Sequence, residues 1–400
     1  MNFYEKLLLF VFCRICDCSR LTPVLDLGMQ PWGNHFLTKE QIGTEPFYPL
    51  RLMVCEQCAA AQLDYTVKKE ILFTNSSATR TSTAHFKQLA CSVNERFFKD
   101  QPKKSALDIG SNTGIQLQAF QELGYNVLGV ESSRSTAQIA IEQGVPTLPA
   151  FYNLTTANQI GQSFDVINAS QVFCHLEELH SVSEAIAKYL KPNGVFVVQF
   201  LYMHSILETT AFDRIHHEHL LYYTLKTISH LLNRHGLQLF DAELSSIHGG
   251  SIIGYASHSR EPTPRLQKLM QEEELSGCNN LIAYQLFANR VQALKQENLS
   301  FLEERKRANQ RIVGLGASAK ANTLLNYFGI TSDTIECLVE KKRQHAGLFS
   351  PGTHLPIFLE QEAPKPDLYY VLLQRSRQEL LNSSIAFYHP LQPKESLCIS

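Results

Sequence analysis

The sequence has no strong excess of charge of either sign and no apolar run long enough to cross a membrane. Its 36 lysines and arginines nearly balance 38 aspartates and glutamates, for a formal net charge of -2. Near neutrality gives no electrostatic reason to expect binding to nucleic acid or to an anionic membrane. No segment approaches the roughly 20 apolar residues that span a bilayer. We therefore expect neither nucleic acid nor membrane as a partner.

The amino-terminal stretch MNFYEKLLLFVFC also lacks the features of an export signal. Its apolar run, residues 7–12, is shorter than the apolar region of a signal peptide, and no small residues precede Cys13. We expect a cytoplasmic protein.

Ten cysteines are present, and four of them form two CxxC pairs, Cys13/Cys16 and Cys55/Cys58. Two such pairs a few dozen residues apart are typical of loops that bring four thiolates around one tetrahedral zinc. Chance pairs or a redox CxxC are the alternatives, and Cys18 is an additional thiol without an assigned role. Because four thiolates leave zinc no open position, we predict a structural site with Cys13, Cys16, Cys55 and Cys58 as ligands.

The chain is long enough for two or three domains, and its hydrophobic pattern divides it into three segments. From residue 105, short apolar runs alternate with helical patterns, which is typical of parallel strands joined by helical crossovers. Residues 264 to 310 have a charged helical pattern, and a second strand–helix unit begins at residue 311. We predict an α/β protein with a zinc-stapled domain (1–85), a Rossmann-like domain (86–240) and a second Rossmann-like, substrate-binding domain (241–400).

The segment LDIGSNTG, residues 107–114, reads as a strand, a glycine-rich turn and the start of a helix. Gly110 and Gly114 let the backbone approach a ligand, and the helix offers free N–H groups. Glu131 ends the next strand, where a carboxylate accepts both hydroxyls of a ribose. Asp108 would repel a pyrophosphate but suits the cationic aminoacyl end of S-adenosylmethionine. The candidate cofactor-binding residues are Asp108, Gly110, Ser111, Asn112, Gly114, Glu131 and Gln171.

A second glycine loop, GLGASAK, has the GxGxxA spacing at Gly314, Gly316 and Ala319. This spacing is typical of dinucleotide-binding loops, and Glu340 could end the following strand. The loop therefore supports an alternative, an NAD-linked dehydrogenase, while close packing of a strand, turn and helix explains the same residues equally well. In this loop Lys320 could meet a phosphate.

The segment FDRIHHEH, residues 212–219, ends in three histidines and a glutamate. The HExxH pattern of zinc proteases is absent, because the residue four after His217 is Leu221. His216 and His217 would diverge on a helix or a strand, whereas His216 and His219 could share one helical face. The segment is therefore a poor metal site by itself. It follows a strand of the cofactor sheet, where substrates meet cofactors; solvated histidines at the start of a surface helix are the alternative.

Several motifs follow one another along the chain: CRIC, VLDLG and CEQC, then LDIGSNTG and GVE, then FDRIHHEHLLYYTL, HGGS, GASAKANTLLNYFGI and PGTHLPI. In this order they resemble, over nearly the whole chain, the three-domain sugar C-methyltransferases of deoxysugar biosynthesis. The resemblance implies a zinc-binding N-terminal domain, a central S-adenosylmethionine domain and a Rossmann-like C-terminal domain. It also implies a nucleotide-linked 4-keto-6-deoxysugar as substrate, methylated at the carbon beside the ketone.

The same resemblance implies roles for individual residues. His219 matches the general base, and Glu218 matches an active-site carboxylate that orients the base or binds the sugar. A C–H beside a carbonyl is acidic enough for a positioned histidine, and the resulting enolate attacks the sulfonium methyl. His248 in HGGS matches another active-site position. The candidate substrate-binding residues are His248, Lys320 and Asn322.

Two departures from the family pattern concern tyrosines. His216 stands where the family commonly has a tyrosine before HEH, and LFTNSSATRTS stands where tyrosines commonly follow LF. A tyrosine hydroxyl can donate to a developing enolate oxygen, and His216 could do the same, so we count it among the catalytic residues. O-methylation of a related sugar, or a zinc-containing protein that has lost activity, are the remaining alternatives.

Overall fold

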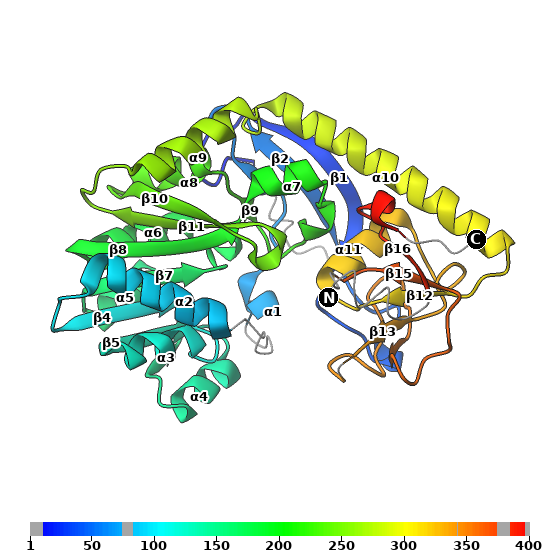
Figure 1. The fold of residues 1–400 in the computed structure, drawn as a ribbon, viewed down its shortest axis with the longest axis horizontal. Helices are drawn as coiled ribbons and strands as arrows, with labels where there is room; N and C mark the ends of the chain where they lie inside the picture. The colour runs from blue at the N-terminus through cyan, green and yellow to red at the C-terminus, as the bar shows by residue number, and fades with distance from the viewer. Residues whose placement is uncertain (1–10, 74–82, 342, 374–384, 397–400) are drawn as a thin grey trace, which may run out of the picture.

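The chain is built around three separate β-sheets (Figure 1). The computed structural model describes residues 11–73, 83–341, 343–373 and 385–396. The predicted α/β class is confirmed, because two of the three sheets contain parallel strands connected through helices. Most of the amino-terminal apolar run, and residues 74–82 of the stretch that departs from the family tyrosines, lie outside the described residues.

The first sheet is antiparallel and has the order β1-β2-β3-β9. In β2 every second side chain from Leu50 to Val54 is buried, the alternation of a strand with one face on a core. The last strand comes from the central segment and pairs Tyr222 with Ala61. The histidine segment thus leads directly into a strand of the N-terminal domain's sheet. The strands are β1 (Leu21–Pro31), β2 (Phe47–Cys55), β3 (Ala61–Leu63) and β9 (Leu221–Tyr222).

The second sheet has seven strands in the order β10-β11-β8-β7-β4-β5-β6. The five strands from β8 to β6 are parallel, and their apolar runs are buried on both faces by helices. From β4 the chain builds β5 and β6 on one side and then β7 and β8 on the other, so the order reverses between β4 and β7. Ligands of such sheets bind outside the carboxyl ends of the strands at that reversal.

The elements of this second unit are β4 (Lys104–Ile109), β5 (Tyr125–Glu131), β6 (Thr147–Pro149), β7 (Phe164–Ser170), β8 (Leu190–Leu201), β10 (Gln238–Ser245) and β11 (Ser251–Ser257). The helices are α1 (Lys69–Phe73), α2 (Thr83–Val93), α3 (Ile115–Glu122), α4 (Arg134–Glu142), α5 (Leu154–Ile160), α6 (Leu179–Tyr189), α7 (Met203–Thr209) and α8 (Leu225–Asn233). The short helices are the π-helix η2 (Asn94–Phe98) and the 3-10 helices η3 (Phe173–His175), η4 (Phe212–Arg214) and η5 (Ile247–Gly249).

The boundary expected after residue 240 falls inside a strand. Strand β10 crosses that position and pairs with β11, which in turn pairs with β8. Backbone hydrogen bonds therefore join residues 241–257 to the central sheet, because the apolar faces of this hairpin complete the core of that sheet. The division of the chain at 85 and 240 remains a prediction about domains.

The third sheet is parallel and has the order β14-β13-β12-β15-β16. The long helix α10 extends from the central unit to this one, as Figure 1 shows. Among the described residues, no helix is long and apolar enough to cross a membrane. The elements are α9 (Pro264–Leu275), α10 (Leu281–Arg307), β12 (Ile312–Leu315), α11 (Ala319–Phe328), β13 (Leu338–Glu340), β14 (Ile357–Leu359), β15 (Leu368–Val371), β16 (Ala386–Tyr388) and the 3-10 helix η6 (Pro393–Glu395). Another 3-10 helix, η1 (Lys39–Gln41), lies between β1 and β2.

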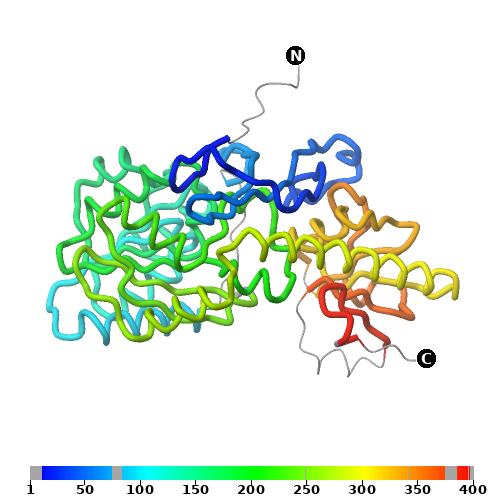
Figure 2. Tube along the Cα trace, turned by 90° about the horizontal axis from the view of Figure 1, so that it is seen from above, coloured from blue at the N-terminus to red at the C-terminus, as the bar shows by residue number. Residues whose placement is uncertain are grey.

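The N-terminal domain contacts both larger units, and Figure 2 shows its chain running along them. Its cysteine loops share one apolar core with the central sheet and α8. Leu25 and Leu52 of its sheet share another core with Phe287 of α10 and Leu324 of α11. Because this domain contacts both units, it can position a site that lies between them.

Candidate functional site

Four cysteine thiols from two loops converge beside the first sheet. Cys13 Sγ lies 3.5 Å from Cys58 Sγ, Cys16 Sγ lies 3.6 Å from Cys55 Sγ, and all four sulfurs lie within 4.8 Å of one another. Tetrahedral zinc with bonds of about 2.3 Å needs sulfurs about 3.8 Å apart, so this thiol set fits the ion. Cys18 lies outside the cluster, where its sulfur accepts the N–H of Arg20. The four predicted ligands form a closed set, as a structural zinc requires.

The glycine-rich turn after β4 has the strand, turn and helix start that its sequence predicts. Its two glycines are required by packing within the chain, whereas the sequence alone suggested approach to a ligand. Gly110 and Gly114 have φ of +69° and +81°. A Cβ at Gly110 would lie 2.6 Å from Val172 Cγ2, and one at Gly114 would lie 2.9 Å from Val145 Cγ2. Both glycines are therefore required by the fold itself, through positive φ and close packing.

Polar groups in and beside this turn are nevertheless left for a ligand. The Ser111 hydroxyl and the Gln116 amide nitrogen are buried and have no hydrogen-bond partner among the described residues. Buried polar atoms without partners cost free energy, so a bound polar molecule at this turn is favoured. Gln171 follows β7 at the reversal of strand order, with φ of +60°, and its amide donates to Ser251 Oγ over 3.3 Å.

Two buried carboxylates flank the turn. Glu131, at the end of β5, accepts the N–H of Asn112 and the N–H of Ser133, each over 2.9 Å. Burial raises the pKa of Asp108 to about 7, against the amide of Asn168 that donates to it over 2.5 Å. A cationic group beside Asp108 would restore its charge. The turn therefore fits S-adenosylmethionine, whose ribose would meet Glu131 and whose ammonium group would meet Asp108.

The histidine segment is buried between η4 and β9. His216 and His219 are 8% and 9% exposed, and their ring centroids are 3.9 Å apart. The Nδ1–H of His219 donates to the carbonyl of Arg214 over 3.1 Å, which leaves the lone pair on Nε2. Burial, with the neighbouring histidines adding to it, lowers the pKa of His219 well below its usual value. Burial also lowers the pKa of His216 to about 4, so both rings are neutral near pH 7.

His175 belongs to this site and was missed by the sequence reasoning. It lies on η3, its ring centroid is 5.1 Å from that of His219, and its Nδ1–H donates to the carbonyl of Glu218 over 2.6 Å. Burial opposes its charged form, but Cys174 and Glu218 outweigh burial and raise the pKa of His175 to about 9. Its position shortly after the end of β7 was the available signal.

The carboxylate of Glu218 is held by the N-terminal domain. Its Oε1 accepts the indole N–H of Trp32 and the amide of Asn34, each over 2.7 Å, while Oε2 lies 4.0 Å from His216 Nδ1. Trp32 and Asn34 belong to the PWGN turn that follows β1. Asn322 of α11 donates to the carbonyl of Gly33 in that turn over 2.7 Å. The turn therefore connects the histidine segment to the C-terminal unit.

His217 has a structural contact instead of a place beside the other rings. Its Nε2–H donates to the carbonyl of Pro49 over 3.2 Å, and its ring meets Tyr48 edge-on at 5.7 Å. This histidine fastens the segment to β2.

The predicted substrate residues lie on two elements. Lys320 is at the start of α11, where burial lowers its pKa and the nearby charge of Asp213 opposes that effect. Asn322 is buried, and its Oδ1 has no hydrogen-bond partner among the described residues. His248 is in η5, but its side chain lies outside what the structure describes. The guanidinium of Arg214 donates to the carbonyl of Gly249 over 3.0 Å and so joins HGGS to the histidine segment.

The second glycine loop is filled by its own chain. A Cβ at Gly316 would lie 2.1 Å from Leu373 Cγ, and one at Gly314 would lie 2.5 Å from Leu338 Cδ2. The Ser318 hydroxyl accepts the N–H of Ala321 and caps α11. Close packing accounts for these residues, and the NAD-linked alternative gains no support from them.

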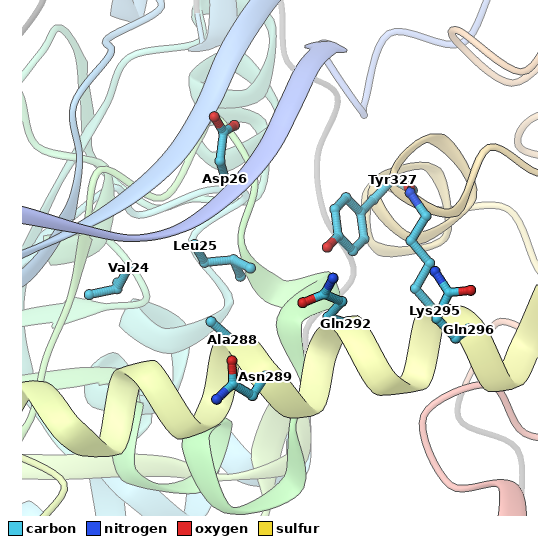
Figure 3. Close-up of a pocket in the computed structure, with 9 residues that line it drawn as sticks. All are labelled: Val24, Leu25, Asp26, Ala288, Asn289, Gln292, Lys295, Gln296 and Tyr327. Carbon is cyan, nitrogen blue, oxygen red and sulfur yellow. The ribbon is translucent and has the colours of Figure 1, made fainter.

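A surface pocket of about 320 Å³ lies elsewhere, between β1, α10 and α11 (Figure 3). Its lining contains none of the predicted site residues. Its lysine, Lys295, donates to the carbonyl of Tyr327 and lies 4.5 Å from the centroid of that ring. The ammonium group of Lys295 therefore already has partners within the chain.

Comparison with known proteins covers the chain in three consecutive parts. Residues 13–73 match the family model "Putative zinc binding domain", residues 83–242 match "Methyltransferase domain", and residues 246–389 match "C-methyltransferase C-terminal domain". Together the three matches extend from residue 13 to residue 389, in the order that the sequence motifs predict. This confirms the family resemblance and the predicted methyltransferase activity. S-adenosylmethionine and structural zinc, for which the structure provides fitting residues, are the cofactors of this C-methyltransferase.

Individual relatives differ in their identity to this chain and in how much of it they match. The C-methyltransferase NovU of Streptomyces niveus is 26% identical over 94% of this chain and 92% of its own length. A ubiquinone biosynthesis O-methyltransferase of Rhodopseudomonas palustris is 30% identical over 33% of this chain and 49% of its own length. A solved structure, the magnesium protoporphyrin IX methyltransferase ChlM of Synechocystis PCC 6803 with bound SAH, is 15% identical, covering 44% of this chain and 83% of that chain at a TM-score of 0.36.

The thiol cluster predicts about one zinc per chain after purification without added metal. Cys55→Ser removes a ligand, so we expect loss of the zinc and a clear fall in melting temperature, since metal binding contributes folding free energy. Metal analysis and thermal unfolding measure both effects. Cys18→Ser is the matched control and should keep its zinc. A Cys55→Ser protein with full zinc content and unchanged melting would contradict the assignment.

The contact between Trp32 and Glu218 predicts an optical signal, because the sequence contains one tryptophan. Excitation moves electron density in the indole away from the N–H end, so the carboxylate stabilises the excited state. Glu218→Gln removes that charge, and we expect the fluorescence emission to move to shorter wavelength. The control Glu177→Gln should leave the emission unchanged, since Glu177 bonds Lys69 instead. Identical emission from wild type and Glu218→Gln would show that this contact does not exist in solution.

Proposed function

We propose that this C-methyltransferase methylates the carbon beside the ketone of a nucleotide-linked keto-deoxysugar, with His219 as the base. The observation that carries the proposal is the state of His219: its ring is buried and neutral, and a backbone carbonyl holds its Nδ1–H. A base for a C–H bond needs an unprotonated nitrogen in a fixed position, and Nε2 of this ring meets both needs.

The proposed reaction changes two atoms of the substrate: the carbon loses a proton, and the carbonyl oxygen gains negative charge. His219 Nε2 takes the proton from the carbon, and the C–H electron pair moves into the carbon–carbon bond as the carbonyl oxygen becomes an enolate. S-adenosylmethionine supplies an electrophilic methyl group bound to a cationic sulfur. The enolate carbon forms the new C–C bond, the sulfur keeps the electrons of the broken bond, and the ketone re-forms.

Two neighbouring histidines with opposite pKa shifts suit these two tasks, proton removal from carbon and stabilisation of the charge on oxygen. The pKa of His219 is lowered, whereas that of His175, whose ring centroid is 5.1 Å away, is raised to about 9. Environments that separate the pKa values of two groups assign one as base and the other as acid. We assign protonated His175 to the developing enolate oxygen. Neutral His216, in the position of the family tyrosine, can donate a second hydrogen bond there.

The charge around the segment suits a nucleotide-linked substrate. Among the described residues, no hydrogen bond or ion pair holds the ammonium of Lys320, and Arg214 is close enough to oppose the charge of Lys320. Two cations beside the base can receive a diphosphate. The nucleotide sugar itself rests on the family motifs, and the cytoplasmic location expected from the sequence remains a prediction.

Replacing the proposed base tests the assignment directly. His219→Gln should lower methyl transfer by about 100- to 10,000-fold, the usual contribution of a general base, with S-adenosylmethionine binding unchanged. The matched control is His217→Gln, because its amide can still donate to Pro49; it should transfer methyl within a few-fold of wild type. The assay is label transfer from S-adenosylmethionine to a panel of nucleotide-linked keto sugars.

Two outcomes of that assay would contradict the proposal. Transfer by His219→Gln within a few-fold of wild type would remove His219 as the base. Label lost from the product by acid hydrolysis would show methylation of oxygen, because a methyl group on carbon is retained.

The pKa shifts also predict the pH dependence of methyl transfer. A base must be unprotonated, and the pKa of His219 lies well below 6.5, so the rate should stay level from about pH 8 down to about pH 6. His175 must be protonated, so the rate should fall as the pH rises through about 9. His175→Gln should be slower and should lack this alkaline fall. A rate already halved near pH 6.5 would indicate an unshifted histidine base.

A further inference from the structure

We propose that Cys174, His175 and His219 form a second metal site, for a zinc-like divalent ion that switches the enzyme off by occupying the base. The site shares no residue with the four-cysteine cluster. The sequence of the histidine segment alone does not reveal this site, because two of its three ligands, Cys174 and His175, come from η3.

The ligand atoms are close to the spacing that the ion needs. The Cys174 sulfur and one ring nitrogen from each histidine lie within 4.8 Å of one another. Tetrahedral zinc, with bonds of about 2.3 Å to sulfur and about 2.0 Å to nitrogen, places such atoms about 3.3–3.6 Å apart. Side-chain movements of about 1 Å at most would close that difference.

Both histidines already have the hydrogen bonds typical of metal ligands. A ligating histidine usually donates its other N–H to a backbone carbonyl or a carboxylate, which fixes the ring and its tautomer. His175 donates Nδ1–H to the carbonyl of Glu218, and His219 donates Nδ1–H to the carbonyl of Arg214. Each ring therefore keeps Nε2 for a metal.

The sulfur is available and the charges balance. Cys174 is buried, and its thiol makes one weak hydrogen bond, 3.7 Å to the carbonyl of Gln171. Cys174 is close enough to the His175 ring to raise the pKa of that histidine. Metal binding releases the thiol proton of Cys174 and the second ring proton of His175 to solvent, and leaves a thiolate and two neutral rings around the ion. The carboxylate of Glu218 is close enough to offset the remaining positive charge.

Three protein ligands leave a tetrahedral ion one open position. The ion would use the Nε2 lone pair that His219 needs for proton abstraction, so binding and catalysis exclude one another. This inhibitory consequence rests on the proposed function of His219, whereas the metal site itself does not.

Zinc binding tests the site without any substrate. Protein that holds one zinc is dialysed against micromolar Zn²⁺, and the bound zinc is counted by metal analysis. Wild type should bind two ions per chain. Cys174→Ser should need at least about 10-fold more free zinc for the second ion, since even weaker perturbations of metal ligands cost that much. The matched control Cys278→Ser, another buried cysteine, should bind two ions like wild type.

Methyl transfer tests the consequence. Zinc should inhibit wild type and Cys278→Ser, and the inhibiting concentration, measured against the zinc-free rate of each protein, should rise at least about 10-fold in Cys174→Ser. If Cys174→Ser does not fold, Cys174→Ala replaces it in both measurements. Absence of a second ion in wild type, or equal binding by Cys174→Ser, would overturn the site. A second ion that leaves methyl transfer unaffected would overturn the switch and count against His219 as the base; absence of methyl transfer to every keto sugar would contradict the proposed function alone.

Discussion

The carboxylate of Glu218 is the point at which three parts of the chain meet. The N-terminal domain donates to it through Trp32 and Asn34, and the same PWGN turn accepts a hydrogen bond from Asn322 of the C-terminal unit. The backbone carbonyl of Glu218 accepts a hydrogen bond from Nδ1–H of His175, which belongs to the central unit. One residue therefore determines both where the histidine segment lies and which way a neighbouring ring faces. The zinc-binding domain contributes to the site through this contact, because zinc would keep its loops folded and the loops support the first sheet.

Burial outweighs the nearby carboxylate of Glu218 at most of the histidines in the site. His216, His217 and His219 are buried, and each has a lowered pKa, since an apolar surrounding disfavours the charged ring. His175 differs because Cys174 and Glu218 favour its charged form. Four histidines in one small region thus divide into neutral rings and one cation. The neutral rings can accept protons or metal ions, and the cation can stabilise negative charge.

Much of the fold could be predicted from local patterns. The alternation of apolar strands and helices from residue 105 onward predicted the α/β class, and β2 shows the burial pattern of its sequence. The edge of the central sheet was less predictable. The sequence pattern assigned residues 241–257 to the C-terminal domain, and only their pairing with β8 shows that they extend the central sheet. The pairing of β3 with β9 joins segments about 160 residues apart, and no local pattern in either strand indicates its partner.

The sequence by itself determined the four-cysteine cluster, the glycine-rich turn after β4 and the position of the histidine segment after a strand of the central sheet, because each depends on short spacings within the chain. Only the tertiary structure decided which histidines share a site. His217 turns to Pro49, while His175 and Cys174 join His219 from another element. The same holds for Trp32, which lies 186 residues from Glu218, and for Leu373, which fills the second glycine loop. Contacts of this kind depend on how whole sheets pack, so the residues on either side of them carry no local sign of the partner.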